Sequence, residues 1–243
     1  MTTKILEQFK AQKGQIAVLI DPEKSQNKTY LKSLIEKAEF AGINYFFVGG
    51  STANKAQLEK VVLTLKALTK IPVVLFPGNY HQVSKDADAI LYLSLLSGRN
   101  AEYLIGQHIQ NACAIKEMDI EVIPTAYLLI DGGKQSAVAY VSQTTPLPQD
   151  QISLITNTAI AGELQGKQLI YLDAGSGAKE SVDPKIVKVL QEKTTLPMVV
   201  GGGLRSIEQL ENLKTVNVLV IGNKLEEDLD FLLDLKGLKA SIF

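Results

Sequence analysis

The last two apolar runs of the sequence that are rich in β-branched residues end in Gly201-Gly202-Gly203 and in Gly222-Asn223. Glycine lets a ligand approach the backbone closely, and unpaired backbone N–H groups bind phosphate. The helical pattern after Gly203 starts near Ser206, a residue type that caps helices, so the first amides and the positive end of the helix dipole would face a bound anion. A single glycine pair is usually only a tight turn. Two such endings in succession predict a phosphate site.

A third apolar run continues into Tyr171-Leu172-Asp173-Ala174-Gly175-Ser176-Gly177, a loop of small residues with one carboxylate and one hydroxyl. Side chains alternate along a strand, so Tyr171 and Asp173 point to the same side. If that side faces the site, Asp173 can accept a proton from a substrate hydroxyl, and Ser176 would face the phosphate. The competing interpretation is that Asp173 only caps its own loop.

Oxygen ligands follow the first two apolar runs. Asp21 closes the first run, and Ser51 follows Gly49-Gly50 after the second. Mg²⁺ prefers oxygen ligands, keeps several waters and often takes further ligands from substrate phosphates, so Asp21 and Ser51 are a sufficient protein contribution. Helix capping by either residue is the alternative interpretation.

The elements that must position these residues alternate along the chain. Apolar runs rich in β-branched residues predict eight strands, over Gln15–Ile20, Tyr45–Val48, Val73–Phe76, Ala89–Leu93, Glu121–Leu129, Gln168–Leu172, Met198–Val200 and Val216–Ile221. Apolar residues spaced by three and four predict seven helices, over Tyr30–Ala41, Ala56–Leu68, Ala101–Met118, Gln149–Gly166, Asp183–Glu192, Ser206–Leu213 and Glu226–Leu235. The connection Gly78–Asp88 is short and polar, which favours an irregular segment in place of the third helix.

Eight continuously apolar strands need cover on both faces, and eight strand and helix units in 243 residues fit a closed barrel. We therefore predict the α/β class and a single (β/α)₈ TIM-like barrel domain over residues 1–243. An open dinucleotide-binding sheet is disfavoured because Asp21-Pro22-Glu23-Lys24 stands where its glycine fingerprint would be. The stretch Asp131–Pro148 reads as an insertion that forms a lid over one mouth of the barrel.

Composition excludes several classes of protein. The chain is 46% hydrophobic and 21% charged, and 25 basic against 26 acidic residues leave a net charge of −1, without the basic footprint of a nucleic-acid partner. No apolar stretch approaches the roughly 18 residues that span a bilayer, and the polar start lacks a signal peptide, so we expect a cytoplasmic protein. The single cysteine, Cys113, falls in a helical pattern, where we expect it to be buried.

The ordered set of motifs resembles the geranylgeranylglyceryl phosphate synthase and PcrB family over almost the whole chain. The motifs are Asp21-Pro22, Val48-Gly49-Gly50-Ser51, Phe76-Pro77-Gly78-Asn79, Ser97-Gly98-Arg99-Asn100, Tyr171–Ala178, Gly201–Leu204 and Gly222-Asn223. The resemblance implies a Mg²⁺-dependent prenyltransferase that joins the 3-hydroxyl of sn-glycerol 1-phosphate to a polyprenyl diphosphate, here the C20 geranylgeranyl diphosphate. It also implies a modified TIM barrel without the third helix, and a homo-oligomer.

The resemblance also implies roles for individual residues. Asp21 and Ser51 match the metal site, and Asp173, Tyr171 and Asp21 form the catalytic group. The glycerol phosphate site matches Tyr171, Leu172, Asp173, Ala174, Gly175, Ser176, Gly177, Gly202, Gly203, Gly222 and Asn223. Tyr127 would line the substrate cavity. Two positions depart from the family pattern, because Asp173 replaces the usual Glu and Ala126 the usual Gly.

Other functions stay open from the residues alone. A phosphate site on the last strands also suits a barrel isomerase or aldolase that acts on a sugar phosphate, or a noncatalytic barrel that holds a phosphorylated ligand. An aldolase would need a Schiff-base lysine within a strand, whereas Lys24, Lys179 and Lys224 all follow their strands. The paired Asp-rich motifs of chain-elongating prenyl synthases are absent from the sequence.

Overall fold

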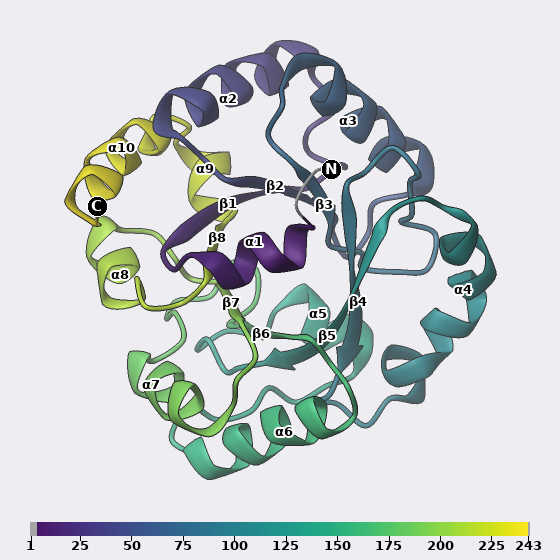
Figure 1. Cartoon of the computed structure of the whole chain (residues 1–243), viewed down its shortest axis with the longest axis vertical. Helices are drawn as coiled ribbons and strands as arrows, with labels where there is room; N and C mark the ends of the chain where they lie inside the picture. The colour runs from purple at the N-terminus through teal and green to yellow at the C-terminus, as the bar shows by residue number, and fades with distance from the viewer. Residues whose placement is uncertain (1–3, 243) are drawn as a thin grey trace.

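Eight parallel strands form a closed barrel in the computed structural model, which describes residues 4–242 and side chains up to residue 236 (Figure 1). Each strand pairs with the next, and β8 closes the barrel on β1. The strands are β1 Gln15–Ile20, β2 Tyr45–Val48, β3 Val73–Leu75, β4 Ala89–Leu95, β5 Glu121–Leu129, β6 Leu169–Asp173, β7 Met198–Gly201 and β8 Val218–Ile221. The predicted (β/α)₈ fold is confirmed, and the strand ends differ by up to two residues.

Helices cover the outside of the barrel. They are α2 Lys28–Ala41, α3 Lys55–Leu68, α4 Gln107–Glu117, α6 Ile152–Leu164, α7 Pro184–Lys193, α8 Ile207–Asn212, α9 Asn223–Glu227 and α10 Phe231–Ile242. Residues 76–88 form turns and irregular structure between β3 and β4, which confirms the predicted gap in the helix pattern. The predicted helix 101–118 is divided into a π-helical turn, η1 Glu102–Gly106, and α4.

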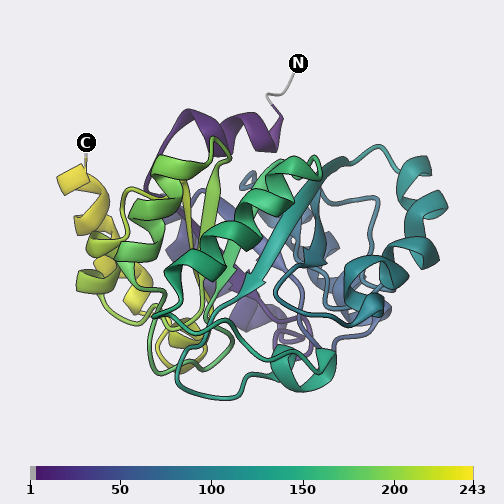
Figure 2. The same ribbon diagram turned by 90° about the horizontal axis from the view of Figure 1, so that it is seen from below.

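A short helix that the sequence analysis missed, α1 Ile5–Ala11, lies across the amino-terminal end of the barrel (Figure 2). Its Phe9 is fully buried, and the Phe9 ring meets the Tyr45 ring edge to face at a centroid distance of 4.9 Å. The Glu121 carboxylate of β5 accepts hydrogen bonds from the α1 amides of Ile5 and Leu6. This end of the barrel is therefore closed, and any ligand must enter from the opposite end.

Strand alternation divides the core into two layers. Residues such as Ala17, Phe47 and Tyr171 fill the barrel interior. Their strand neighbours, such as Val18 and Leu172, pack outward against the helices. The period of two that places Tyr171 inside therefore turns Leu172 away from the interior.

The segment 131–148 lies at the carboxyl ends of the strands, on the opposite side of the molecule from α1 (Figure 2). Within it, α5 Ala137–Ser142 begins at Ser136, whose side chain accepts a hydrogen bond from the Ala139 amide. A bridge between Ile130 and Leu147 closes the base of the segment. This arrangement agrees with the predicted lid position.

One prediction about a single side chain is wrong. Cys113 is exposed, because it lies on the outer face of α4, whereas Asn111 and Ile115 on the other face are buried. Among the described residues, no helix combines the length and the apolar character needed to cross a bilayer.

Candidate active site

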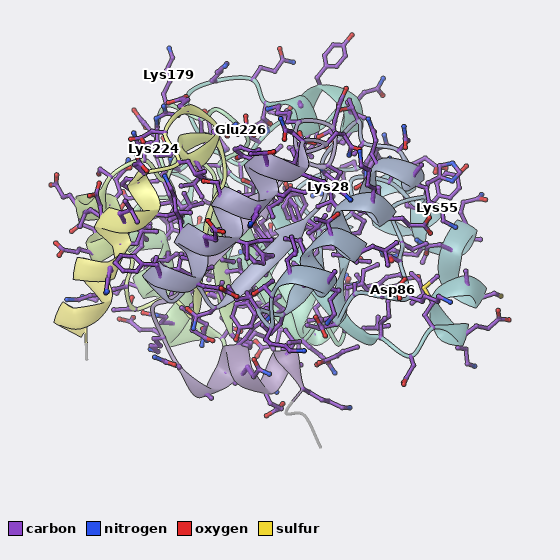
Figure 3. The ribbon with its side chains drawn as sticks, turned by 90° about the horizontal axis from the view of Figure 1, so that it is seen from above. Lys28, Lys55, Asp86, Lys179, Lys224 and Glu226 are labelled. Atoms are coloured by element: carbon purple, nitrogen blue, oxygen red, sulfur yellow. The ribbon has the colours of Figure 1, made fainter. Side chains whose placement is uncertain are left out.

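A cavity of about 360 Å³ opens at the carboxyl ends of the strands. Its lining contains the predicted residues Asp21, Ser51, Tyr127, Tyr171, Asp173, Ser176, Gly177, Gly202, Gly203, Gly222 and Asn223. These residues come from strands at opposite sides of the barrel, so closure of the barrel is what brings them together. Lys179, Lys224 and Glu226 lie at this end of the molecule, away from α1 (Figure 3).

Three residues predicted to bind the substrate do not line the cavity. The side chains of Leu172 and Ala174 pack in the outer layer of the core, because they alternate with Tyr171 and Asp173 along the chain. Gly175 instead shapes the loop: its φ is +90°, and its N–H donates to Asp173 Oδ1 at 2.7 Å. Leu172, Ala174 and Gly175 therefore shape the loop that carries Tyr171 and Asp173, and their own contact with the substrate stays a prediction.

The glycine-rich ends of β6, β7 and β8 form the polar part of the cavity. Asn223 Oδ1 accepts hydrogen bonds from Gly177 N at 2.8 Å and from Ser176 Oγ at 3.1 Å, which ties the loop after β6 to the end of β8. The backbone amides of Ser176, Gly203 and Asn223 have no acceptor among the described residues. Several unpaired N–H groups at one wall of a cavity suit a phosphate.

Close packing explains why glycine stands at the end of β7. Gly202 and Gly203 have φ values of +80° and +69°, which L side chains rarely adopt. A Cβ atom on Gly202 would lie 2.7 Å from Asp173 Oδ1, and one on Gly203 would lie 2.6 Å from the carbonyl oxygen of Glu180. Any side chain at either position would therefore displace the loops that form the site.

The helix after β7 has Ser206 as its N-cap, as predicted, and a capping box engages the amides of Arg205, Ser206 and Gln209. Ser206 Oγ accepts a hydrogen bond from Gln209 N, and the Gln209 side chain accepts from the amides of Arg205 and Ser206. Helix α8 is also only six residues long. Gly202 and Gly203 line the cavity, whereas no described residue of α8 does, so the loop amides are the nearer donors for an anion. The contribution of the end of α8 stays a prediction.

Asp173 is nearly enclosed, with 8% of its surface exposed. Tyr127 Oη donates a hydrogen bond to Asp173 Oδ2 at 2.5 Å, and Gly175 N donates one to Asp173 Oδ1. Burial raises the pKa of the Asp173 carboxyl, although both hydrogen bonds oppose the shift. A carboxylate with a raised pKa in a cavity is suited to accept a proton.

Three aromatic rings stand beside Asp173. Phe76 stacks on Tyr171 at a centroid distance of 5.0 Å, and Tyr127 meets both rings edge to face at 5.9 and 5.5 Å. Burial, with the charge of Asp173, raises the pKa of both tyrosines well above its ordinary value, so both stay neutral O–H donors near neutral pH. The Tyr171 hydroxyl has no protein partner among the described residues and is available to a ligand in the cavity.

Asp21 and Ser51 lie on the other side of the cavity, after β1 and β2. The Asp21 carboxylate accepts a hydrogen bond from Glu23 N at 3.0 Å, and burial raises the pKa of Asp21, against the effect of the nearby Lys24 ammonium. Lys24 Nζ pairs with Glu226 at 2.7 Å. In the part of the chain that the structure describes, no cluster of three His, Cys, Asp or Glu side chains forms a complete metal site.

Apolar side chains form a second part of the cavity lining, which we call the apolar arm. Its walls are formed by β4, η1 and α5, and they include Ile90, Leu93, Leu95, Tyr103, Val138 and Val141. The arm runs beside the irregular segment 76–88, where Tyr80 N donates to Gln107 Oε1 of α4 at 2.8 Å. Sequence reasoning missed the residues of this arm. The short polar segment 76–88 was the feature of the sequence that could have indicated these residues, since a missing helix leaves one side of the barrel uncovered.

Comparison with known proteins identifies the family. The model of the PcrB family matches residues 9–237. This chain belongs to the PcrB family. A geranylgeranylglyceryl phosphate synthase of Zunongwangia profunda is 48% identical over 224 residues, which cover 91% of this chain and 95% of the relative. A protein of the same description from Korarchaeum cryptofilum is 38% identical over 235 residues, which cover 96% of both chains.

A solved crystal structure has the same fold. The crystal structure of (S)-3-O-geranylgeranylglyceryl phosphate synthase from Thermoplasma acidophilum in complex with sn-glycerol-1-phosphate matches with a TM-score of 0.90 and 29% identity. The match covers 97% of this chain and 96% of that chain. The barrel of this PcrB-family member therefore has the architecture of a protein that binds a glycerol phosphate.

Proposed function

We propose that this protein transfers the geranylgeranyl group of geranylgeranyl diphosphate to the 3-hydroxyl of sn-glycerol 1-phosphate, a step of ether lipid synthesis. The observation that carries this proposal is the lining of a single cavity, which combines free backbone amides, the apolar arm and the Asp173 carboxylate. The names of the relatives and the glycerol phosphate in the related crystal structure support the same reaction.

The acceptor phosphate fits the polar wall formed by Ser176, Gly203 and Asn223, whose amides are free to donate. From there, the three-carbon glycerol backbone extends toward the barrel axis. Its 3-hydroxyl would then lie beside Asp173 and Tyr127, which line the same cavity. Binding the acceptor at both ends fixes its orientation, which lowers the entropy cost of the reaction.

The apolar arm suits the prenyl chain of the donor. Its apolar walls bury hydrocarbon, which contributes about 0.8 kcal/mol for each CH₂ group removed from water. Val138 and Val141 of α5 line the arm from the lid segment. The diphosphate of the donor would then lie toward Asp21 and Lys24, on the other side of the acceptor hydroxyl.

Mg²⁺ fits beside Asp21. This carboxylate is half-buried, and its Oδ2 atom accepts from no donor among the described residues, so the oxygen is free to bind a cation. Ser51 would add a hydroxyl, and phosphate oxygens and water would complete the coordination. When bound, Mg²⁺ would neutralise the charge of the departing diphosphate.

Asp173 acts as the proton acceptor in this proposal. The C1–O bond of the donor breaks, its electron pair leaves with diphosphate, and C1 becomes an allylic cation. The 3-hydroxyl oxygen forms the new C–O bond and gives up its proton toward Asp173. Because the electrophile is already reactive, orientation and late removal of the proton are the main demands on the protein.

Incubation with sn-glycerol 1-phosphate, Mg²⁺ and prenyl diphosphates of several lengths tests this function, with the products identified by mass. We expect geranylgeranylglyceryl phosphate and diphosphate, with the C20 donor used best. Preferred use of a longer or shorter donor would contradict the assignment of chain length alone. Absence of any prenylated product, with turnover of a sugar phosphate instead, would replace the proposal with an isomerase or aldolase.

A further inference from the structure

We infer that the Tyr127 hydroxyl is a catalytic group that carries the proton of the acceptor hydroxyl to Asp173. This inference rests on the proposed function and assigns a second residue to its proton transfer. It follows from the way in which the two oxygens of Asp173 are already occupied.

Both oxygens of the Asp173 carboxylate are engaged by protein donors. Oδ1 accepts from Gly175 N at 2.7 Å, and the loop at Gly202 packs so closely that a Cβ there would approach Oδ1 to 2.7 Å. Oδ2 accepts from Tyr127 Oη at 2.5 Å. Direct access to either oxygen is therefore restricted, and only 8% of the Asp173 surface is exposed.

Tyr127 contacts both the Asp173 carboxylate and the cavity. It lines the cavity from β5, the strand that pairs with β6, and in the register of these strands Tyr127 lies opposite Tyr171. Its ring is held edge to face against Phe76 and Tyr171, so the direction of the hydroxyl is fixed. Tyr127 is 5% exposed, which leaves the hydroxyl only small freedom to move.

The hydroxyl of Tyr127 has the hydrogen-bonding capacity that a relay needs. A phenol has one O–H donor and two acceptor lone pairs. The donor is used on Asp173 Oδ2, and the Oη atom accepts no hydrogen bond among the described residues. The acceptor side is therefore free to receive the O–H of a glycerol hydroxyl in the cavity.

The glycerol hydroxyl passes its proton to Tyr127 Oη, while the proton of Tyr127 moves to Asp173 Oδ2. The oxygen of the glycerol forms its bond to C1 of the donor, and the electron pair of the broken C1–O bond leaves with diphosphate. Tyr127 is neutral before and after the step, so the raised pKa of its hydroxyl, which disfavours a free phenolate, is no obstacle.

A double-mutant cycle with Tyr127→Phe and Asp173→Glu tests the relay. We expect Tyr127→Phe alone to lower kcat by about 10²- to 10⁴-fold, the usual worth of acid–base assistance, with KM for sn-glycerol 1-phosphate changed only a few fold. In the Asp173→Glu background, the extra methylene lets the carboxylate reach the hydroxyl itself. There the same Tyr127→Phe change should cost less than about 10-fold, because the relay is bypassed.

The Tyr45→Phe variant is the matched control. Tyr45 Oη also donates a buried hydrogen bond at 2.5 Å, to Gln15 Oε1, but lies at the closed end of the barrel. We expect kcat to be unchanged in this variant, with a loss of stability comparable to that of Tyr127→Phe. Thermal unfolding of all variants identifies any that fail to fold.

A second measurement on the unmodified protein does not depend on folding of variants. In single-turnover reactions in mixtures of H₂O and D₂O, two protons in motion give a curved dependence of rate on deuterium fraction, and one proton gives a straight line. We expect the rate to depend on the deuterium fraction in the curved way. A straight line, near-normal turnover of Tyr127→Phe, or an equal loss in both backgrounds would overturn the relay. A wild-type protein that forms no prenylated product would remove the proposed function, and the relay with it.

Discussion

The carboxyl group of Asp173 is nearly enclosed by protein, yet it must be ionised to accept a proton. Hydrogen bonds from Tyr127 and Gly175 stabilise the charged form, while burial favours the neutral form and prevails. The sequence predicted that Tyr171 and Asp173 share one side of their strand, because alternation is a local property. It did not predict the contact with Tyr127, since that contact depends on how β5 pairs with β6.

The raised pKa of Asp173 predicts the acid limb of the activity profile. Only the ionised carboxylate accepts a proton, so kcat should fall as the pH decreases through a pKa above about 3.9, the ordinary value for Asp. Steady-state rates with both substrates saturating measure this limb. Asp173→Asn should lower kcat by about 10²- to 10⁴-fold and lose the limb. A wild-type profile that stays flat down to about pH 4 would contradict the assignment.

We expect Asp21 to be needed for reaction of the donor diphosphate and not for binding of sn-glycerol 1-phosphate. We expect Asp21→Asn, which keeps the shape of the side chain, to abolish turnover by at least about 10²-fold, because the charge that holds Mg²⁺ is lost. Calorimetric titration should show sn-glycerol 1-phosphate bound about as tightly as by the wild type. Loss of acceptor affinity together with activity would mean that the two roles are not separate.

At the scale of elements, the alternation of strands and helices was enough to predict the barrel. The eight strands were predicted because each is a short apolar run. The longer helices outside the barrel were predicted because each buries only one face. The three short helices α1, α5 and α9 were missed, since each has only five to seven residues and gains its stability from packing on the barrel, and the predicted helix 226–235 runs across the break between α9 and α10. The apolar arm was not predicted, because it forms between elements that are distant in sequence.

The loop after β6 offers a test of the phosphate site. Ser176 is exposed and lines the cavity, so a larger side chain there avoids the crowding that any substitution at Gly202 would cause. We expect Ser176→Glu to weaken sn-glycerol 1-phosphate binding by at least about 10-fold, because it adds a negative charge beside the phosphate. Ser176→Gln, with the same size and no charge, should bind at least several-fold better than Ser176→Glu in the same titration. Equal affinities of the two variants would place the phosphate elsewhere.

At the scale of the whole molecule, stability and function lie at opposite ends of the barrel. Helix α1 closes the amino-terminal end, and the cavity opens at the carboxyl ends of the strands (Figure 2). Side chains at both ends pack in the barrel interior, but the residues of the candidate site all lie at the carboxyl ends of the strands. Assembly into a homo-oligomer stays a prediction of the family resemblance, and light scattering of the purified protein would test it.

The separation of the two ends predicts the effect of removing Phe9. Its ring is fully buried, so Phe9→Ala should lower the free energy of unfolding by about 3 to 5 kcal/mol, as measured in urea. The remaining folded protein should keep its kcat. The control is Phe40→Ala, since the Phe40 ring is 57% exposed and should contribute less than about 1 kcal/mol. Similar losses in both variants would show that α1 does not hold the barrel closed.

In the proposed reaction, the hydroxyl oxygen of a glycerol phosphate attacks C1 of a prenyl donor beside Asp173. A reaction with sn-glycerol 1-phosphate labelled with ¹⁸O in the 3-hydroxyl, with mass analysis of both products, tests this attack. We expect the label to be retained in the ether bond of the prenylated product and the released diphosphate to contain none. Label in the diphosphate, or a prenylated product without label, would show that C1 is not attacked by this oxygen.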